Sequence, residues 1–275
     1  MRFQNMSERF ANNGYIRNDQ GIELFVSYLK GNNQTYWVFC NSLMEESIFL
    51  RPFYQELALF LNQQGNHVIQ FDYAGCGESC GDFSRVNFSS MKDDINSVIK
   101  SIREPSSKEK NIILFGMRIG ANLALSVSSE SNYSCLCWLP VTDGKRFCSD
   151  LLYANMAVQL SNFNRVRTNK KQLLECLHQG KGINVLGYQI KRPLFSAFES
   201  ISIHSFEEIK ENQHVYINIS PANKQIISLI KDKKIKAKTV PIKPFWHEPN
   251  YYPESQTELL DSVGRIASGE EALNL

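Results

Sequence analysis

Gly116-Met117-Arg118-Ile119-Gly120 is the stretch that decides the fold, because it joins a predicted strand to a predicted helix. Upstream, Asn111-Ile112-Ile113-Leu114-Phe115 is a short apolar run typical of a buried strand. Downstream, the run from Ala121 to Val127 is typical of a helix that packs against a sheet. The two glycines permit a strained turn in which strand and helix approach closely. The sequence therefore predicts a strand–turn–helix unit with Arg118 at its apex.

The same context surrounds the nucleophile of α/β-hydrolases, whose elbow has the pattern G-x-S-x-G. Arg118 stands here in the position of the nucleophilic serine. A guanidinium stays protonated at neutral pH and cannot attack a carbonyl carbon. The motif thus predicts an α/β-hydrolase fold, but Arg118 excludes the usual mechanism, in which a serine at this position attacks the substrate.

Length and composition indicate a globular protein. The 275 residues suffice for one α/β domain with an inserted cap, and 43% are hydrophobic while 21% are charged. The net charge of +2, from 30 basic and 28 acidic residues, argues against a nucleic-acid binder driven by bulk charge. No apolar stretch approaches the ~20 residues of a membrane span, and residues 1–13 lack the apolar centre of a secretory signal. We expect a cytoplasmic protein without a membrane span.

Seven cysteines, an odd number in mostly apolar settings, favour free thiols over a disulfide framework. Cys135 and Cys137 belong to a predicted strand, and we expect their thiols on opposite faces, which disfavours a paired metal site. No cysteine–histidine cluster has the spacing of a zinc site. We expect neither a metal nor a cofactor.

The periodicity predicts a mostly parallel sheet covered by helices on both faces, within a single domain spanning 1–275. Residues 143–212 are mostly helical in pattern and are interpreted as a cap or lid inserted over the sheet. The expected strands lie at 22–28, 36–40, 67–71, 111–115, 135–141, 214–219 and 236–242, with helices at 52–62, 90–103 and 253–266 and a loop at 41–47.

Ligands of such sheets bind at the carboxyl ends of the strands. There, Glu45 and Glu46 lie in the predicted loop that supplies one oxyanion-hole N–H in α/β-hydrolases. We expect one of them near Arg118, either as a buried structural ion pair or as part of a substrate site. In the second case Arg118, with Met117 beside it, would bind a carboxylate, a phosphate or the phosphopantetheine of an acyl carrier.

Two further residues are catalytic candidates. Cys76 lies at the tip of the glycine-rich loop 72–79 and would be a nucleophile if His247 lowered its pKa; the alternative is a small buried thiol. His247 follows the last predicted strand, where the catalytic histidine of an α/β-hydrolase is found, although a histidine beside Trp246 is often only packed. The acidic member of a triad is missing, because Asn223 cannot stabilise an imidazolium as a carboxylate does.

Six segments of the chain carry a resemblance to a known family: Glu45-Glu46, Gly75–Phe83, Gly116–Gly120, Trp138–Phe147, Gly187–Ile190 and Pro244–Trp246. Together they resemble the exosortase A system-associated hydrolase 2 family, a branch of the α/β-hydrolase superfamily near the serine aminopeptidase-like lipases. The resemblance extends from about Tyr36 to Pro253, and His247 is not expected as a family feature. It implies a role beside extracellular-polysaccharide or protein-sorting gene systems, or in another biosynthetic cluster.

Two functions remain open from the sequence. The leading hypothesis is a divergent hydrolase or acyltransferase that lacks a serine nucleophile and acts in a biosynthetic pathway. Its substrate would be an acyl ester or thioester, either a small molecule or carrier-bound. Arg118 would bind an anionic part of the substrate, and activated water or Cys76 would react, with His247 as the base. The alternative is a non-catalytic pseudoenzyme that binds a ligand or a partner enzyme. A base within reach of a nucleophile in an open pocket favours the first, whereas Arg118 locked by Glu45 or Glu46 favours the second.

Overall fold

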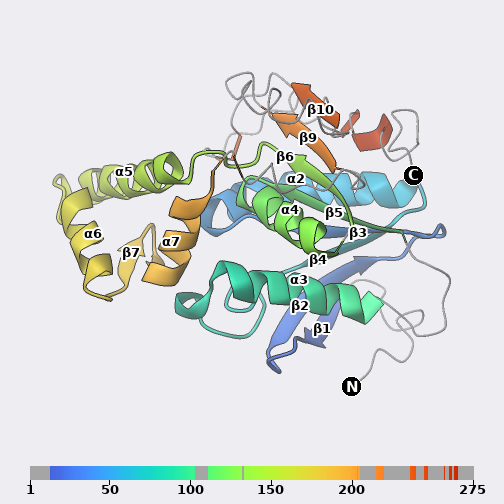
Figure 1. Ribbon diagram of the computed structural model, residues 1–275, viewed down its shortest axis with the longest axis horizontal. Coiled ribbons are helices and arrows are strands. Elements are labelled where there is room, and N and C mark those ends of the chain that lie inside the picture. The colour runs from blue at the N-terminus through green and yellow to red at the C-terminus, as the bar shows by residue number, and fades with distance from the viewer. Residues whose placement is uncertain are drawn as a thin grey trace.

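A computed structural model describes residues 13–102, 111–131, 133–202, 204, 215–219, 236–239, 245–246, 257, 260–261 and 263–265. Its centre is an eight-stranded sheet with the order β1-β2-β4-β3-β5-β6-β9-β10 (Figure 1). The pairs from β4 to β10 are parallel, whereas β1–β2 and β2–β4 are antiparallel. The strands are β1 (Asn13–Arg17), β2 (Glu23–Leu29), β3 (Thr35–Cys40), β4 (His67–Phe71), β5 (Asn111–Met117), β6 (Ser134–Trp138), β9 (Val215–Ile219) and β10 (Lys236–Thr239).

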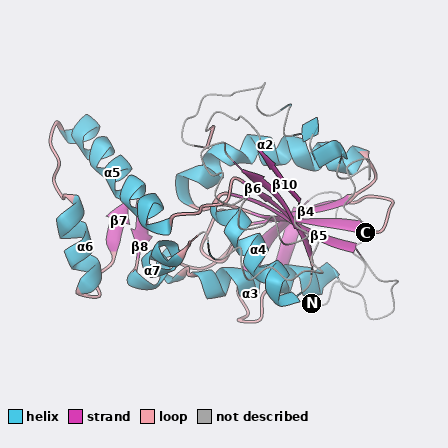
Figure 2. Ribbon diagram, turned by 45° about the horizontal axis from the view of Figure 1, so that its top comes forward, coloured by secondary structure: helices cyan, strands magenta, loops and turns pink. Residues whose placement is uncertain are grey.

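Helices cover both faces of the sheet, as predicted. Figure 2 shows α2 (Met44–Gln63) on one face and α3 (Phe88–Ile102) with α4 (Ile119–Ser131) on the other. A short 3-10 helix, η1 (Phe83–Arg85), precedes α3. None of the helices in the described part of the chain has the length and apolar character that crossing a bilayer requires.

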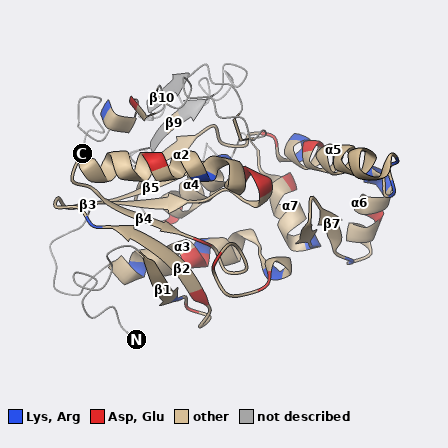
Figure 3. Cartoon of the chain, turned by 180° about the vertical axis from the view of Figure 1, so that it is seen from behind, with Lys and Arg blue, Asp and Glu red and all other residues tan. Residues whose placement is uncertain are grey.

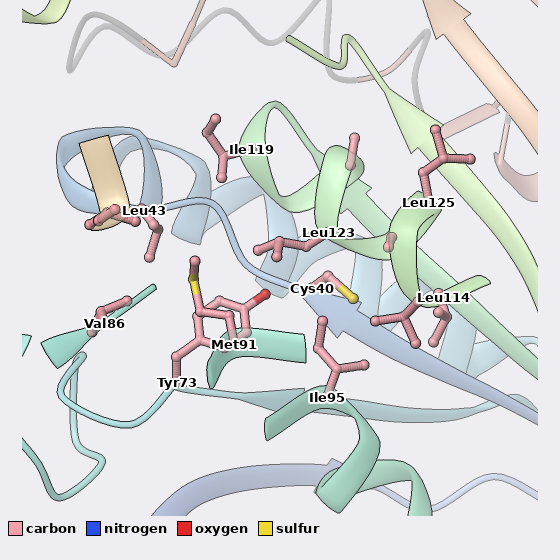
Figure 4. Close-up of a cluster of buried hydrophobic side chains, with 14 of the residues drawn as sticks. Cys40, Leu43, Tyr73, Val86, Met91, Ile95, Leu114, Ile119, Leu123 and Leu125 are labelled. Atoms are coloured by element: carbon pink, nitrogen blue, oxygen red, sulfur yellow. The ribbon is translucent and has the colours of Figure 1, made fainter. Parts of the chain in front are cut away.

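Alternation along the strands separates two buried cores. In β3, Trp37 and Phe39 pack with the residues of α2, whereas Val38 and Cys40 belong to the core beneath α3 and α4. Figure 4 shows part of the second core, where Cys40 lies among side chains of both helices, including Leu123 of α4. The sheet is therefore apolar on both faces, which explains why its central strands have continuous apolar runs rather than alternating ones.

The same alternation corrects our expectation for β6. Cys135 and Cys137 lie on one face of the strand, with their Sγ atoms 3.6 Å apart, because residues two positions apart in a strand point the same way. The prediction of opposite faces was wrong. Among the described residues, no group of three or more His, Cys, Asp or Glu side chains could hold a metal ion.

The first main helix begins earlier than predicted. The expected loop at 41–47 ends at Met44, where α2 starts, and Pro52 lies inside the helix rather than at its beginning. Glu45 and Glu46 consequently occupy the first helical turn, where the helix dipole stabilises carboxylates. The strand expected at 135–141 is also shorter and ends at Trp138, because Leu139 adopts a left-handed conformation with φ of 48°.

Between β6 and β9 the chain forms a unit that we call the α5–α7 segment, residues 144–200. Figures 1 and 2 show that it lies beside the sheet at one end of the molecule. Its two short strands form a hairpin whose turn, Leu186-Gly187, has positive φ at both positions, as a tight two-residue turn requires. A lid function for this segment stays a prediction. Its elements are α5 (Gly144–Phe163), α6 (Lys170–His178), β7 (Ile183–Val185), β8 (Tyr188–Ile190) and α7 (Arg192–Ser200).

Candidate functional site

The turn between β5 and α4 has the strained backbone of a nucleophile elbow. Arg118 at its apex has a φ of 55°, a backbone conformation that residues other than glycine rarely adopt. Gly120 fits the turn because a Cβ atom there would lie 2.2 Å from the carbonyl oxygen of Cys40. A Cβ atom on Gly116 would lie 2.2 Å from the carbonyl oxygen of Gly120, so β5 and α4 approach as closely as the sequence predicts.

Backbone bonds hold this turn independently of the side chain at its apex. The Arg118 N–H donates to the Trp138 carbonyl at 3.0 Å, and the Arg118 carbonyl accepts from the Ala121 N–H at 3.0 Å. The amide of Asn122 both donates to and accepts from the backbone of Val141, which ties α4 to the segment after β6. The elbow geometry is therefore a property of the scaffold.

The side chain of Arg118 is engaged on three sides. Its Nε donates to Glu46 Oε1 at 3.0 Å, and one terminal nitrogen lies 3.4 Å from the Leu139 carbonyl. Its guanidinium carbon lies 5.0 Å from the centre of the Trp246 ring, within the range of a cation–π contact. The second oxygen of Glu46 accepts a hydrogen bond of 2.8 Å from Ser42 Oγ. Arg118 pairs with Glu46 and has no ion pair to Glu45.

This ion pair is largely removed from water, since the side chains of Arg118 and Glu46 are 16% and 11% exposed. Both charges are compensated by each other and by further hydrogen bonds, which is the condition for a tolerable buried pair. The bond between Arg118 and Glu46 also closes the position where an α/β-hydrolase would carry its nucleophile.

An open pocket lies next to the elbow, at the carboxyl ends of β3 and β4. We call it the β3–β4 pocket; its volume is about 350 Å³, and neither Arg118 nor Glu46 lines it. The start of α2, the glycine-rich loop after β4, η1 and the hairpin strand β8 surround it. Its lining residues are Asn41, Ser42, Leu43, Met44, Ser47, Ile48, Arg51, Asp72, Tyr73, Gly75, Cys76, Gly77, Phe83 and Tyr188.

One cation and one carboxylate face each other in this pocket. Arg51 lies 3.9 Å from Asp72, a long separation for an ion pair, and the arginine side chain is 60% exposed. Asp72 also accepts a hydrogen bond of 3.0 Å from the Glu78 N–H. A Cβ atom on Gly77 would lie 2.2 Å from the same carboxylate, so Asp72 shapes the loop. Arg51 therefore remains available to a ligand.

Cys76 lines the pocket as predicted for a candidate nucleophile, but its surroundings oppose ionisation. Burial raises the pKa of the Cys76 thiol to about 12, and the carboxylates of Asp72 and Asp94 act in the same direction. A thiol with this pKa is protonated at neutral pH and is a weak nucleophile. For Cys76 to react as predicted, a base would have to take the proton of its thiol. The described groups that act on Cys76 raise its pKa instead.

The other predicted site residues are distributed as follows. Met117 is buried, and its N–H donates to the Tyr54 hydroxyl at 2.9 Å rather than facing the pocket. Glu45 lies near β8. Burial raises the pKa of Tyr188 in that strand, and the negative charge of Glu45 raises it further. His247 and Asn223 lie outside the described residues, so their roles stay predictions.

Arg51 lines the pocket but was not predicted from the sequence as a site residue. The reason is the predicted helix start near Pro52, which left Arg51 outside the helix. Met44, Ser47, Ile48 and Arg51 lie at helical spacing on one face once α2 begins at residue 44. The signal was the pair of acidic residues after Leu43, which is typical of a first helical turn.

Comparison with known proteins identifies the fold. Residues 50–137 match the model of the family described as serine aminopeptidase, S33, and this region includes the elbow. No curated protein matches the chain significantly in sequence.

Solved structures match over nearly the whole chain. The α/β-hydrolase GrgF from Penicillium sp. sh18 has a TM-score of 0.62 and 12% identity, with 94% of this chain and 97% of that chain covered. Est1E from Butyrivibrio proteoclasticus, solved with ferulic acid bound, has a TM-score of 0.61 and 12% identity, with 92% and 97% covered. An esterase from Exiguobacterium antarcticum has a TM-score of 0.60 and 14% identity, with 92% and 98% covered. With its parallel sheet, its two helical layers and its strained elbow after β5, the chain has the α/β-hydrolase fold.

Proposed function

We propose that the chain binds a small, largely apolar molecule with an acidic group in the β3–β4 pocket, and that its elbow performs no nucleophilic catalysis. The observation that carries this proposal is the buried Arg118–Glu46 pair at the apex of the elbow. A largely buried arginine does not attack a substrate, and its pairing with a carboxylate leaves less of its charge for one.

The lining of the pocket supports the class of ligand. Leu43, Ile48 and Phe83 offer apolar surface, and the volume of about 350 Å³ lies at the lower end of the ~300–1,000 Å³ typical of ligand sites. Arg51 is its exposed cation and is only loosely paired. A short acyl chain would pack against the apolar residues while its carboxylate pairs with Arg51.

A second function, the hydrolysis or transfer of an acyl ester or thioester, is favoured by the position of Cys76 in the same pocket. The thiolate would attack the acyl carbonyl, release the alcohol or thiol, and leave an acyl-cysteine for water or an acceptor to cleave. His247 would take the proton from the thiol. The biosynthetic role that the family resemblance implies belongs to this candidate, and the high pKa of Cys76 counts against it.

Binding is tested by calorimetric titration with octanoate and with 1-octanol, which differ in charge. We expect octanoate to bind more tightly, and Arg51→Gln to weaken octanoate by about tenfold while leaving octanol unchanged. Arg85→Gln, which removes an exposed cation outside the pocket lining, is the matched control. Equal effects of the two substitutions, or no octanoate binding, would contradict the proposed ligand class.

Catalysis is tested with p-nitrophenyl esters and acyl thioesters. We expect no turnover above buffer by wild type, Arg118→Ala, Cys76→Ala or His247→Ala. Turnover by the wild type that is lost in Cys76→Ala or His247→Ala would establish the second function instead. Loss in Arg118→Ala alone would assign substrate anchoring to Arg118 and overturn the closed elbow.

A further inference from the structure

Exposed apolar side chains gather at one end of the molecule. Eight large apolar residues are exposed in the described part of the chain, and five of them lie between positions 153 and 166. Tyr153 and Leu160 are seven residues apart and share one face of α5, and Phe163 is exposed at the end of the helix, whereas Cys148 and Leu152 are buried. A concentration of this kind marks an interaction surface more often than isolated exposed residues do. The five are Tyr153, Val158, Leu160, Phe163 and Val166.

Positive charge gathers in the same segment. Residues 144–200 contain nine Lys or Arg and three Asp or Glu, a net charge of +6, whereas the rest of the chain contains 21 and 25, a net charge of −4. Each of the three acidic residues is paired with a cation of the segment. Figure 3 shows basic positions at both ends of α5 and on α6. The remaining cations of the segment therefore give it an excess of positive charge.

Two of these cations lie directly on the exposed aromatic rings. The guanidinium carbon of Arg167 is 3.5 Å from the centre of the Phe163 ring, and Lys170 Nζ is 4.9 Å from the centre of the Tyr153 ring. Leu160 lies on the same helix face and is 54% exposed. We define the α5–α6 face as Tyr153, Leu160, Phe163, Arg167 and Lys170.

The connection between the helices holds this arrangement in place. Gln159 Oε1 accepts hydrogen bonds from the N–H groups of Arg167 and Thr168, and its Nε2 donates to the Thr168 carbonyl. Asn164 ends α5 in a left-handed conformation, and Asn169 begins α6 with a capping box. The cations and the apolar side chains are thus presented together by an ordered corner.

We propose that the α5–α6 face docks on an anionic lipid bilayer. Cations beside exposed aromatic and aliphatic side chains suit the boundary between headgroups and acyl chains, where phosphates and apolar surface are both within reach. Charge complementarity favours an anionic surface, since residues 144–200 have a net charge of +6. The position of α5 and α6 at the end of the molecule lets a flat surface reach them (Figure 1). This proposal does not depend on what the β3–β4 pocket binds.

The test is co-sedimentation of the full chain with vesicles of phosphatidylcholine alone and with added phosphatidylglycerol. We expect binding only to the anionic vesicles and its loss in high salt. Leu160→Glu should weaken binding at least about tenfold, since it removes an inserted leucine. Leu59→Glu on α2 is the matched control, because Leu59 is 55% exposed and lies away from the face.

A charge substitution separates electrostatic from apolar contributions. Arg167→Glu should weaken binding about fivefold or more, whereas Arg85→Glu should leave it nearly unchanged. Circular dichroism of all four variants confirms that they are folded. Equal binding of Leu160→Glu and Leu59→Glu, or no binding to anionic vesicles, would overturn the proposal. A different outcome would be that the wild type does not bind vesicles but is retained on immobilised poly-L-glutamate, while Leu160→Glu and Arg167→Glu are not retained. The proposal would then be overturned in favour of an acidic protein as the partner of this face.

Discussion

The elbow and the β3–β4 pocket lie side by side at the carboxyl edge of the sheet, yet one is closed and the other is open. Ser42 joins them, since it lines the pocket while its hydroxyl donates to Glu46 of the elbow pair. At the elbow, the side chains of Arg118 and Glu46 form a largely buried ion pair. In the pocket, Arg51 is exposed and loosely held.

This difference between elbow and pocket shows that the backbone geometry of the elbow does not determine its chemistry. The strained φ of Arg118 is held by Gly116, Gly120 and main-chain hydrogen bonds, none of which depends on the side chain at the apex. The elbow of this fold therefore persists without a nucleophile, and a strained turn alone does not predict catalysis. Binding, by contrast, requires space, which the β3–β4 pocket provides.

The largest expected effect concerns the reactivity of the pocket thiol. Because burial and two carboxylates raise the pKa of Cys76 to about 12, its thiolate fraction near pH 8 should be about a thousandfold below that of a thiol with an ordinary pKa. Timed iodoacetamide labelling with peptide mass spectrometry measures this, with the exposed Cys80 as the internal reference. Labelling of Cys76 as fast as that of Cys80 would reveal a base acting on Cys76 and would make the pocket catalytic.

The second effect is on stability at the closed elbow. Glu46→Gln leaves the buried guanidinium of Arg118 without its counter-charge, and we expect the free energy of unfolding to fall by about 3 kcal/mol. Urea denaturation measures the change, and Glu45→Gln, one position earlier and without an ion pair to Arg118, is the matched control.

A double substitution sharpens this result. Arg118→Met with Glu46→Leu removes both charges together and should restore most of the lost stability, because no uncompensated charge remains. If Glu46→Gln proves no worse than Glu45→Gln, the pair does not close the elbow, and Arg118 becomes available to a ligand.

The third effect tests whether the backbone or the ion pair maintains the elbow. Gly120→Ala would place a Cβ atom 2.2 Å from the Cys40 carbonyl oxygen, and we expect a loss of about 2–3 kcal/mol from the required backbone shift. Gly180→Ala is the comparison, since it meets no atom within 4 Å and should cost only about 1 kcal/mol for its positive φ. Similar losses in thermal or urea unfolding would show that β3 does not restrict the elbow.

Much of the fold was predictable because it depends on local patterns. The apolar runs of β3, β4 and β5 and the elbow glycines predicted a parallel sheet with a tight turn, and the structure confirms both. The start of α2 was not predicted, because Pro52 is more typical of a first helical turn than of an interior one. That error displaced Arg51 from the candidate site.

The site itself depended on contacts that spacing does not determine. The sequence predicts an ion pair between Arg118 and one of the two adjacent glutamates. Which one it is depends on the start of α2 at Met44, which directs Glu46 toward Arg118 and Glu45 toward β8. Likewise, the pKa of Cys76 follows from burial and from Asp94 on α3, which is distant in the sequence. Such long-range electrostatic effects are not visible in a motif.

The smallest effect concerns a second buried carboxylate, on the pocket side. Asp94 accepts hydrogen bonds from the Asn18 amide and the Ala74 N–H, which anchors the loop after β4, whereas Glu46 at the elbow is held by a guanidinium. Burial raises the pKa of Asp94 above its ordinary value. The folded state therefore binds this proton more tightly than the unfolded state does.

The sign of the pH dependence follows from that difference. Between the ordinary aspartate pKa of about 3.9 and the raised one, the folded chain holds more protons, so the contribution of Asp94 to stability falls as pH rises. Relative to Asp94→Asn, which does not titrate, the wild type should therefore gain stability when urea denaturation is moved from near pH 7 to about pH 4. A gain for wild type in the opposite direction would mean that its hydrogen bonds, rather than burial, dominate the proton affinity of Asp94. The pocket loop would then be held by a charged carboxylate, as the elbow is.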